Sequence, residues 1–231
     1  MALANAHAAS CPQGVPSEEF SALTPKAKAA KPGRVEQIAG AFAPLLFVSP
    51  AQVNFQLPWE VEVSSGFINL QVIRDGVASA PVRVAVSVFS PAVFSFDFGP
   101  GRAIAINPDG SVAHPADSFG GAVPSRPVRA GEALIILANG LGPTNPPPDT
   151  GFNSLDADGN FVRRDTIETP RVTIGGVEQQ VLFSGMSPEF AGVYQLNILV
   201  TEGTPTGDAQ PLILEIGGRR SRLDVTVAVG P

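Results

Sequence analysis

His114 and its sequence neighbours have the clearest potential for acid–base chemistry. Ser111 and Asp117 lie close to it in the sequence, which supplies a nucleophile, a base and a carboxylate. A histidine within hydrogen-bond reach of a serine can activate the hydroxyl for hydrolysis. The sequence has no Gly-x-Ser-x-Gly motif that would place this serine on a nucleophile elbow. The alternative interpretation is that His114 is a polar loop residue that follows a hairpin turn at 107–111.

A second group of polar residues has spacing that resembles a calcium-binding loop. Asp156, Asp158 and Asn160 place side-chain oxygens at alternating positions, as calcium loops do. The pattern departs from an EF-hand, because Gly159 comes fourth in the run instead of sixth and Ile167 stands where a bidentate glutamate belongs. A β-turn centred on Gly159 explains the same residues. Calcium and a plain turn therefore remain alternatives, and the sequence implies no other cofactor.

Aromatic residues are the third group with a conceivable binding role, since exposed rings can stack on sugars. The chain has 14 phenylalanines but only one tryptophan, Trp59, and one tyrosine, Tyr194. Phenylalanines on strand positions are expected in the core. Trp59 follows Pro58 at a strand end and is the best candidate for a sugar platform, with Tyr194 as the second. Packing between modules is the alternative role for Trp59.

Charge and hydropathy exclude several classes of function. The formal net charge of −6 argues against a nucleic-acid partner, because phosphates require a basic face. No apolar stretch reaches the roughly 18 residues that a membrane-spanning helix needs. The single cysteine, Cys11, cannot form an internal disulfide and leaves the redox compartment open. The first residues also lack the basic region of a secretory signal peptide.

The elements that must position these residues are strands. From Arg34 onward apolar residues recur with a period of two, and the 24 glycines and 23 prolines interrupt every candidate helix. The chain is therefore predicted to be all-β. The predicted strands cover residues 52–57, 67–73, 82–88, 102–106, 133–138, 171–174, 181–184, 193–200, 212–216 and 223–229.

An internal repeat predicts how these strands are organised. In both 46–57 and 182–200 a Leu-Phe pair is followed by Ser-Pro and then by an alternating Gln-x-Asn strand. Downstream, Leu70 matches Leu214, and the offset is about 140 residues. Two copies predict two tandem immunoglobulin-like β-sandwich modules. The second copy has a strand at 131–143 before its repeat core, so we expect the first module to lack its opening strands.

The predicted domains follow from the repeat. Residues 1–33, which contain the chain's only lysines, are expected to form a flexible tail or linker. The first, partial module is predicted at 34–95 and the second at 96–231, with a long loop insertion at 143–170. Loops of this length are functional or flexible, so we expect any binding to use this insertion and the loop at 113–129.

Five motifs of the sequence occur in a fixed order: Leu45-Leu-Phe-Val-Ser-Pro-Ala-Gln-Val-Asn-Phe-Gln-Leu-Pro58, Ala105-Ile-Asn-Pro-Asp-Gly-Ser111, Asn139-Gly-Leu-Gly-Pro143, Val172-Thr-Ile-Gly-Gly176 and Ala191-Gly-Val-Tyr-Gln-Leu-Asn197. Together these motifs resemble the C-terminal domain family that is abundant in secreted proteins of Solibacter and other Acidobacteria. The strand at 131–143 also resembles the opening of IPT/TIG-type immunoglobulin-like modules. The family resemblance implies an extracellular or cell-surface location at the C-terminus of a larger bacterial protein, and it implies no catalytic residues.

These observations favour a non-catalytic extracellular interaction or spacer module with a protein or glycan partner. Two alternatives stay open. One is a hydrolase on a β-sandwich scaffold that uses His114 with a nearby serine or aspartate, assisted by calcium. The other is a carbohydrate-binding module that uses Trp59 and Tyr194. Exposed sheet edges also favour a homodimer formed by strand pairing.

Overall fold

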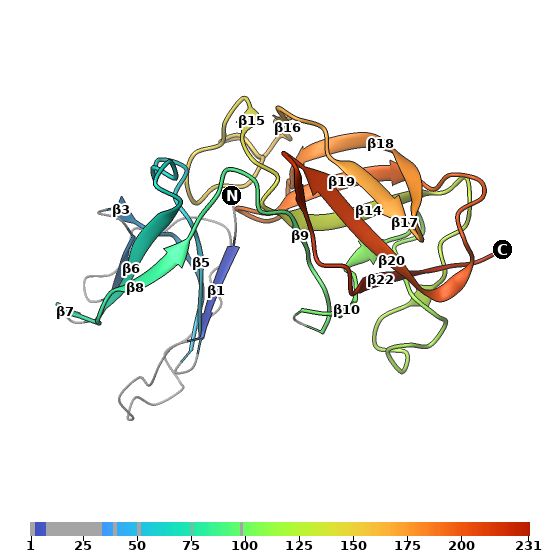
Figure 1. Cartoon of the computed structure of the whole chain (residues 1–231), viewed down its shortest axis with the longest axis horizontal. Helices are drawn as coiled ribbons and strands as arrows, with labels where there is room; N and C mark the ends of the chain where they lie inside the picture. Colours follow the sequence, from blue (N-terminus) through green and yellow to red (C-terminus); the bar gives the residue numbers. More distant parts are fainter. Residues whose placement is uncertain (1–2, 8–33, 39–40, 50–51, 75, 98) are drawn as a thin grey trace. The chain divides into compact units, whose positions relative to one another are not determined.

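The computed structural model (Figure 1) describes residues 3–7, 34–38, 41–49, 52–74, 76–97 and 99–231, with side chains from residue 41 onward. Every regular element of two or more residues in these ranges is a β-strand, which confirms the predicted all-β class. None of the described residues forms a helix that is long and apolar enough to cross a bilayer. The chain divides into a first unit, residues 1–87 with 149–152, and a second unit, residues 88–148 with 153–231.

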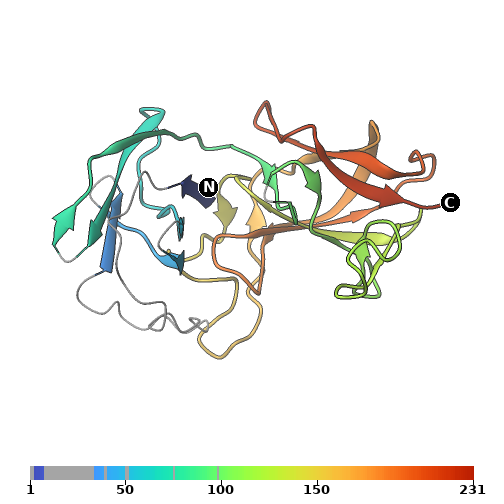
Figure 2. The ribbon, with the colours of Figure 1, turned by 90° about the horizontal axis from the view of Figure 1, so that it is seen from below.

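The second unit is one large mixed sheet that curls into a half-barrel (Figure 2). Its strands pair in the order β10-β22-β20-β17-β18-β19-β14-β11-β12-β13. Most pairs are antiparallel, whereas β10 with β22 and β12 with β13 are parallel. The strands are β9 (Ala92–Val93), β10 (Gly101–Arg102), β11 (Ala105–Ile106), β12 (Val112–Ala113), β13 (Ser125–Arg126), β14 (Ala133–Asn139), β15 (Thr144–Asn145), β16 (Asp165–Thr166), β17 (Arg171–Ile174), β18 (Val177–Met186), β19 (Tyr194–Leu199), β20 (Gly207–Ile216), β21 (Arg219–Arg220) and β22 (Val225–Val229).

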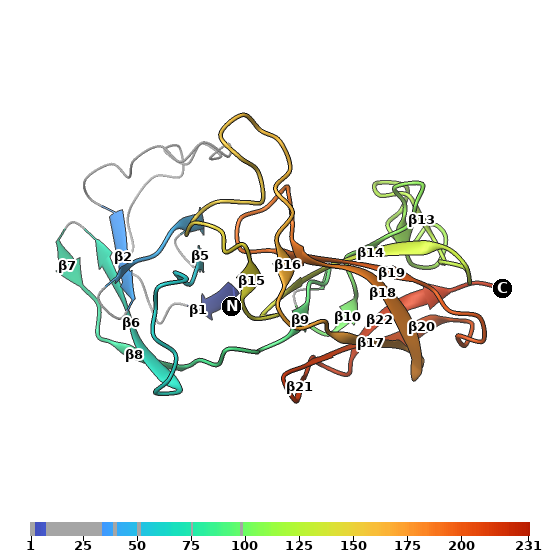
Figure 3. The ribbon, with the colours of Figure 1, turned by 90° about the horizontal axis from the view of Figure 1, so that it is seen from above.

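Two long strands give the sheet its curl. β18 pairs with β17 through its first residues and with β19 through the rest, with a bulge between Val181 and Phe183. β20 likewise pairs with β22 in its first half and with β17 in its second half, with an irregularity between Gly207 and Gln210. A bulge adds a residue to one strand and increases its bend. β18 and β20 therefore bend along their length, and each pairs with one neighbour in its first part and with another in its second part (Figure 3).

Alternating side chains fill the inside of the second unit. β19 alternates between buried and half-buried residues along its whole length, as the period of two predicts. Its buried residues Leu196 and Ile198 have no exposed surface. Further fully buried apolar side chains of this unit come from other strands of the same sheet and include Leu134, Ile136, Val172, Ile174, Leu212 and Leu214.

The first unit consists of two small sheets in the order β1-β5-β4 and β3-β2-β6-β7, with β8 also paired to β6. Its apolar core consists of Phe55, Leu57, Ile68 and Leu70, together with Ala43 and Val61. The strands are β1 (Leu3–His7), β2 (Arg34–Ile38), β3 (Ala41–Phe42), β4 (Leu45–Val48), β5 (Gln52–Gln56), β6 (Phe67–Arg74), β7 (Val77–Ala78) and β8 (Val82–Ala85).

Two strand pairs of the first unit have counterparts in the second. In the first unit the β4·β5 pair has a bulge between Leu45 and Phe47, and the β18·β19 pair has one between Val181 and Phe183. Asn54 and Asn197 follow the two bulges at equivalent positions, each paired with the phenylalanine. The β2·β6 pair likewise corresponds to the β17·β20 pair.

The strand registers correct one part of the internal repeat, in which the sequence matched Leu70 to Leu214. Ile38 pairs with Leu70 and Ile174 pairs with Leu212, so Leu70 corresponds to Leu212 and not to Leu214. A shift of two residues leaves the same side chains facing the core, because the side-chain period of a strand is two. The sequence match therefore identified the correct face with a wrong register.

The division into units differs from the predicted domains at two places. The boundary falls between Ser87 and Val88 instead of at 95–96, and residues 149–152 of the long insertion belong to the first unit. The predicted tail at 1–33 lies mostly outside the described residues. Its exception is β1, which pairs with β5 along five residues.

Candidate functional site

His114 lies directly after β12 and is fully buried. Its Nε2 atom is 2.9 Å from the carbonyl oxygen of Ala103. Since a carbonyl only accepts, Nε2 carries the proton of the neutral ring. Nδ1 is buried and has no hydrogen-bond partner among the described residues. Burial lowers the pKa of His114, and the bond to Ala103 opposes this shift.

Two phenylalanines enclose the imidazole. The ring of Phe119 lies 5.9 Å from that of His114 and the ring of Phe96 lies 6.3 Å from it, both edge-on. The Arg102 guanidinium sits 4.8 Å from the centre of the Phe119 ring and forms an ion pair with Asp97 at 2.7 Å. This pairing lowers the pKa of Asp97 to about 2. The cluster brings together residues that sequence proximity did not connect with His114.

The predicted catalytic set is not assembled. Ser111 donates its hydroxyl hydrogen to Asp109 at 2.5 Å and accepts a bond from Asn107 within the hairpin turn. Asp117 is exposed on the following loop, with a φ of 60°. His114 instead bonds the backbone of Ala103. His114 lies on the loop that follows the hairpin turn, as the alternative interpretation expected, but its side chain is buried and its hydrogen bond goes to Ala103 instead of to Ser111 or Asp117.

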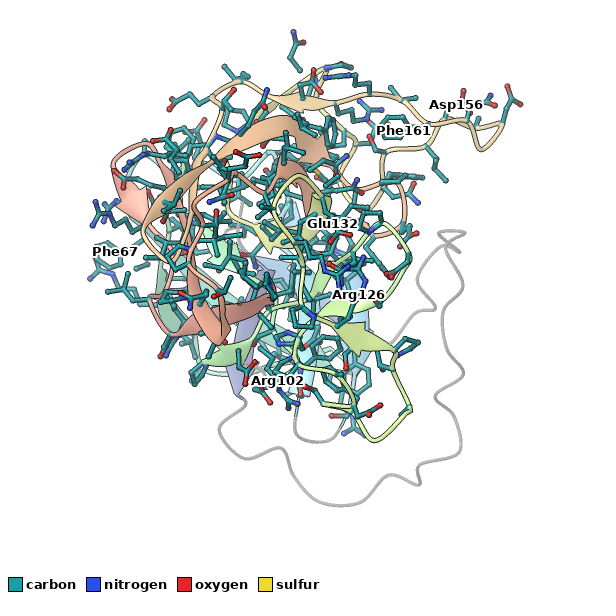
Figure 4. The ribbon with its side chains drawn as sticks, turned by 90° about the vertical axis from the view of Figure 1, so that its right-hand side faces the viewer. Phe67, Arg102, Arg126, Glu132, Asp156 and Phe161 are labelled. Atoms are coloured by element: carbon teal, nitrogen blue, oxygen red, sulfur yellow. The ribbon has the colours of Figure 1, made fainter. Side chains whose placement is uncertain are left out.

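An ion network that the sequence analysis missed lies near this cluster in the second unit. Arg126 bonds Asp109 at 2.6 Å and Glu132 at 2.8 Å, and Figure 4 shows Arg126 and Glu132 close together. Glu132 also accepts the backbone N–H of Arg129 at 2.9 Å. The two carboxylates raise the pKa of Arg126, whose charge lowers theirs. The network joins the 107–111 turn to the start of β14.

The loop between β12 and β13, a predicted binding segment, is held by its own hydrogen bonds. Ser118 and Ser125 both donate to the carbonyl oxygen of Pro115, at 2.6 and 2.9 Å. Arg102 donates to the carbonyl oxygen of Ser118 at 3.4 Å. Phe119 extends from this loop over His114, so the loop contributes to the buried cluster.

The candidate calcium residues form a hydrogen-bonded turn. The Asp156 carboxylate accepts the backbone N–H groups of Asp158 and Asn160, at 2.9 and 2.8 Å. These bonds lower the pKa of Asp156. Figure 4 shows Asp156 at the tip of a projecting loop. Among the described side chains no three His, Cys, Asp or Glu residues gather as metal ligands.

The two candidate sugar platforms have different surroundings. Tyr194 is fully buried in β19 and donates its hydroxyl hydrogen to the carbonyl oxygen of Gly142. A buried ring cannot stack on a sugar, so the interpretation of Tyr194 as a platform was wrong. Trp59 is half-buried, and its backbone N–H donates to the Thr150 hydroxyl at 3.0 Å.

Part of the long insertion is anchored within the first unit. Thr150 donates to Glu60 at 2.7 Å, and the N–H of Gly151 donates to the side-chain oxygen of Gln56 at 2.8 Å. The rest of the insertion belongs to the second unit, where Arg164 donates to the carbonyl oxygen of Pro147 at 2.6 Å.

A shallow hollow lies on the outer face of β17 and β20, between Thr173 and Ile213. Two arginines line it, and each is paired with a glutamate: Arg171 with Glu178 and Arg220 with Glu215, both at 2.8 Å. Both cationic groups therefore have acidic partners, which weakens this face as an anion site.

A scan of the chain against protein-family models and a search of curated proteins both found no match.

Proposed function

We propose that this chain is a non-catalytic extracellular interaction or spacer module, the C-terminal part of a larger secreted bacterial protein. The observation that carries the proposal is the environment of His114. The only described histidine side chain is enclosed by Phe96 and Phe119 and bonded to a backbone carbonyl. These contacts give it a role in packing. Secretion and the bacterial source are taken from the resemblance to the Solibacter family.

We also propose that both units are immunoglobulin-like modules. In an immunoglobulin sandwich one sheet has the strand order A-B-E-D and the other holds C, F and G. Support comes from the second unit, where β11, β14, β19 and the end of β18 are neighbours in that order. The strands β17, β20 and β22 follow on the other side as C, F and G. The matching pairs of the first unit support the same assignment there.

Hydrolysis assays on the intact protein test the non-catalytic proposal. Wild-type protein and the Ser111→Ala variant are compared on chromogenic ester, peptide and glycoside substrates, with and without calcium. We expect both proteins to match the buffer rate. Hydrolysis by the wild-type protein that Ser111→Ala abolishes, with an unchanged near-UV circular dichroism spectrum, would overturn the proposal.

A glycan array tests the remaining carbohydrate alternative. The half-buried Trp59 is the one candidate platform left, and Trp59→Ala removes its ring. We expect no glycan to lose binding in this variant, because the residue lies among the contacts of the first unit. A glycan bound by the wild-type protein and lost in a folded Trp59→Ala variant would favour the carbohydrate-binding alternative.

A further inference from the structure

The strand beside β5 occupies the same place in the first unit as β14 does in the second. β5 and β19 are equivalent, because their partners β4 and β18 carry the same bulge opposite Asn54 and Asn197. On the opposite edge, β19 pairs antiparallel with β14 and β5 pairs antiparallel with β1. The edge of β5 is therefore a position that this type of unit fills with an added strand.

The two occupants of this position differ in size. In the second unit Leu134 pairs with Ile198 and Ile136 pairs with Leu196, and all four side chains are fully buried. In the first unit the matching register positions belong to Ala4, opposite Phe55, and Ala6, opposite Val53. Two alanines replace two large aliphatic residues, and close-packed cores are sensitive to such losses of volume.

We propose that the edge of β5 is a strand-binding site whose preferred occupant is an extended segment of a separate partner polypeptide, with large aliphatic residues at two alternate positions. β1 is then the weaker internal occupant that the partner displaces. The inference rests on the proposed interaction role and assigns it a surface and a partner chemistry. Main-chain hydrogen bonds supply affinity in this mode of recognition, and alternate side chains supply specificity.

The pattern of β14 defines the partner chemistry. Ala133 to Leu137 pairs residue by residue with β19, and every second side chain enters the core. A segment with this pattern can form the same ladder on Gln52–Gln56, since five residues of β5 are already paired in that direction. The bulky side chains would then lie opposite Phe55 and Val53, where β1 has alanines.

A peptide with the β14 sequence tests the proposal on the full chain. The probe is Glu-Ala-Leu-Ile-Ile-Leu-Ala-Asn with two lysines at each end for solubility. The control peptide has alanine in place of the residues that correspond to Leu134 and Ile136. Binding is measured by fluorescence anisotropy and located by amide chemical shifts. We expect the control to bind at least tenfold more weakly, with shifts concentrated in Gln52–Gln56.

Two variants of β1 change the competition in opposite directions. Ala4→Leu with Ala6→Ile strengthens the internal occupant, so we expect at least a tenfold loss of peptide affinity. Ala6→Pro removes a ladder N–H from β1, and we expect it to increase peptide affinity. If the peptide bound through aggregation or general unfolding, its affinity would not fall in one variant and rise in the other.

Three results would overturn the proposal. The first is absence of peptide binding to the wild-type protein and to Ala6→Pro. The second is equal binding to all three proteins, which would place the peptide elsewhere. The third is a stable dimer in which β1 of a second copy fills the edge, detected by size-exclusion chromatography with light scattering. The hydrolysis assays report on the second unit, so failure of this proposal and failure of the non-catalytic role are distinguishable.

Discussion

At the scale of single residues, burial gives His114 a testable effect on stability. Its native pKa is depressed, so the unfolded chain takes up a proton first, at an ordinary histidine pKa near 6.5. Stability should therefore fall as the pH drops through 6.5 toward the depressed native pKa, by at most about 1.4 kcal/mol per pH unit. Urea unfolding of the second unit between pH 8 and 5 measures this slope.

The only other histidine provides a matched control for this pH effect. The chain contains His7 and His114, so His7→Gln should keep the wild-type slope and His114→Phe should remove it. Phenylalanine keeps an aromatic ring at this position but has no group that titrates. A flat wild-type profile across this pH range would contradict the assigned role of burial.

The Tyr194 hydroxyl provides a second prediction for a single residue. It donates to the Gly142 carbonyl in the core, and the ring itself is fully buried. Tyr194→Phe keeps the ring and leaves that carbonyl without this donor, so we expect a loss of about 1–3 kcal/mol in unfolding free energy. Urea unfolding at constant pH measures it. An unchanged midpoint would show that water satisfies the carbonyl equally well.

At the scale of elements, the end of β14 depends on the close approach of two backbone segments. The Gly140 carbonyl accepts the N–H of Ser90 at 2.9 Å, and a Cβ on Gly140 would lie 1.8 Å from the Ser90 carbonyl oxygen. Gly131, before the same strand, has a similar positive φ but open space around it. Gly131→Ala should lower the free energy of unfolding by about 1–2 kcal/mol, because alanine disfavours the left-handed backbone.

Gly140→Ala should cost several kcal/mol more than Gly131→Ala, because backbone atoms on both sides must move apart. The comparison isolates the clash, since both substitutions impose the same side chain on a left-handed residue. Urea midpoints of the two variants measure the difference. Equal losses would contradict the close approach.

Local sequence patterns predicted the full length of strands that have regular partners and only part of the strands that change partner. The predicted run 193–200 contains β19, and 171–174 matches β17. In contrast, β20 begins at Gly207 and not at residue 212, since Pro211 interrupts the apolar pattern. β18 extends on both sides of the predicted 181–184, because its bulge breaks the period of two. Pairing across the bulge stabilises a strand that no local window reveals.

The surroundings of His114 were unpredictable for a related reason. Its partners Ala103, Phe96 and Phe119 come from separate segments that only the folded sheet brings together. Its sequence neighbours Ser111 and Asp117 point to chemistry that the turn geometry then separates. Proximity in sequence was therefore misleading.

At the scale of the whole molecule, the two units differ in how well they cover their apolar residues. The core of the first unit has six buried apolar residues, whereas most of the buried apolar residues of the described chain belong to the second. The first unit also exposes Phe42, Leu46, Phe47, Phe67, Val77, Val82 and Phe152. Stability follows the apolar area removed from water, so the first unit should be the weaker one.

Thermal unfolding followed by scanning calorimetry should therefore show two transitions, with the first unit melting at the lower temperature. Core substitutions assign them, because each unit has its own apolar core. Ile68→Ala should lower only the first transition and Leu214→Ala only the second, each by about 2–5 kcal/mol of unfolding free energy. A single transition that both variants shift equally would show that the units unfold together, and would contradict the weaker first core. If two transitions occur, a bound β14 peptide should raise the lower one alone, because only the first unit holds the edge of β5.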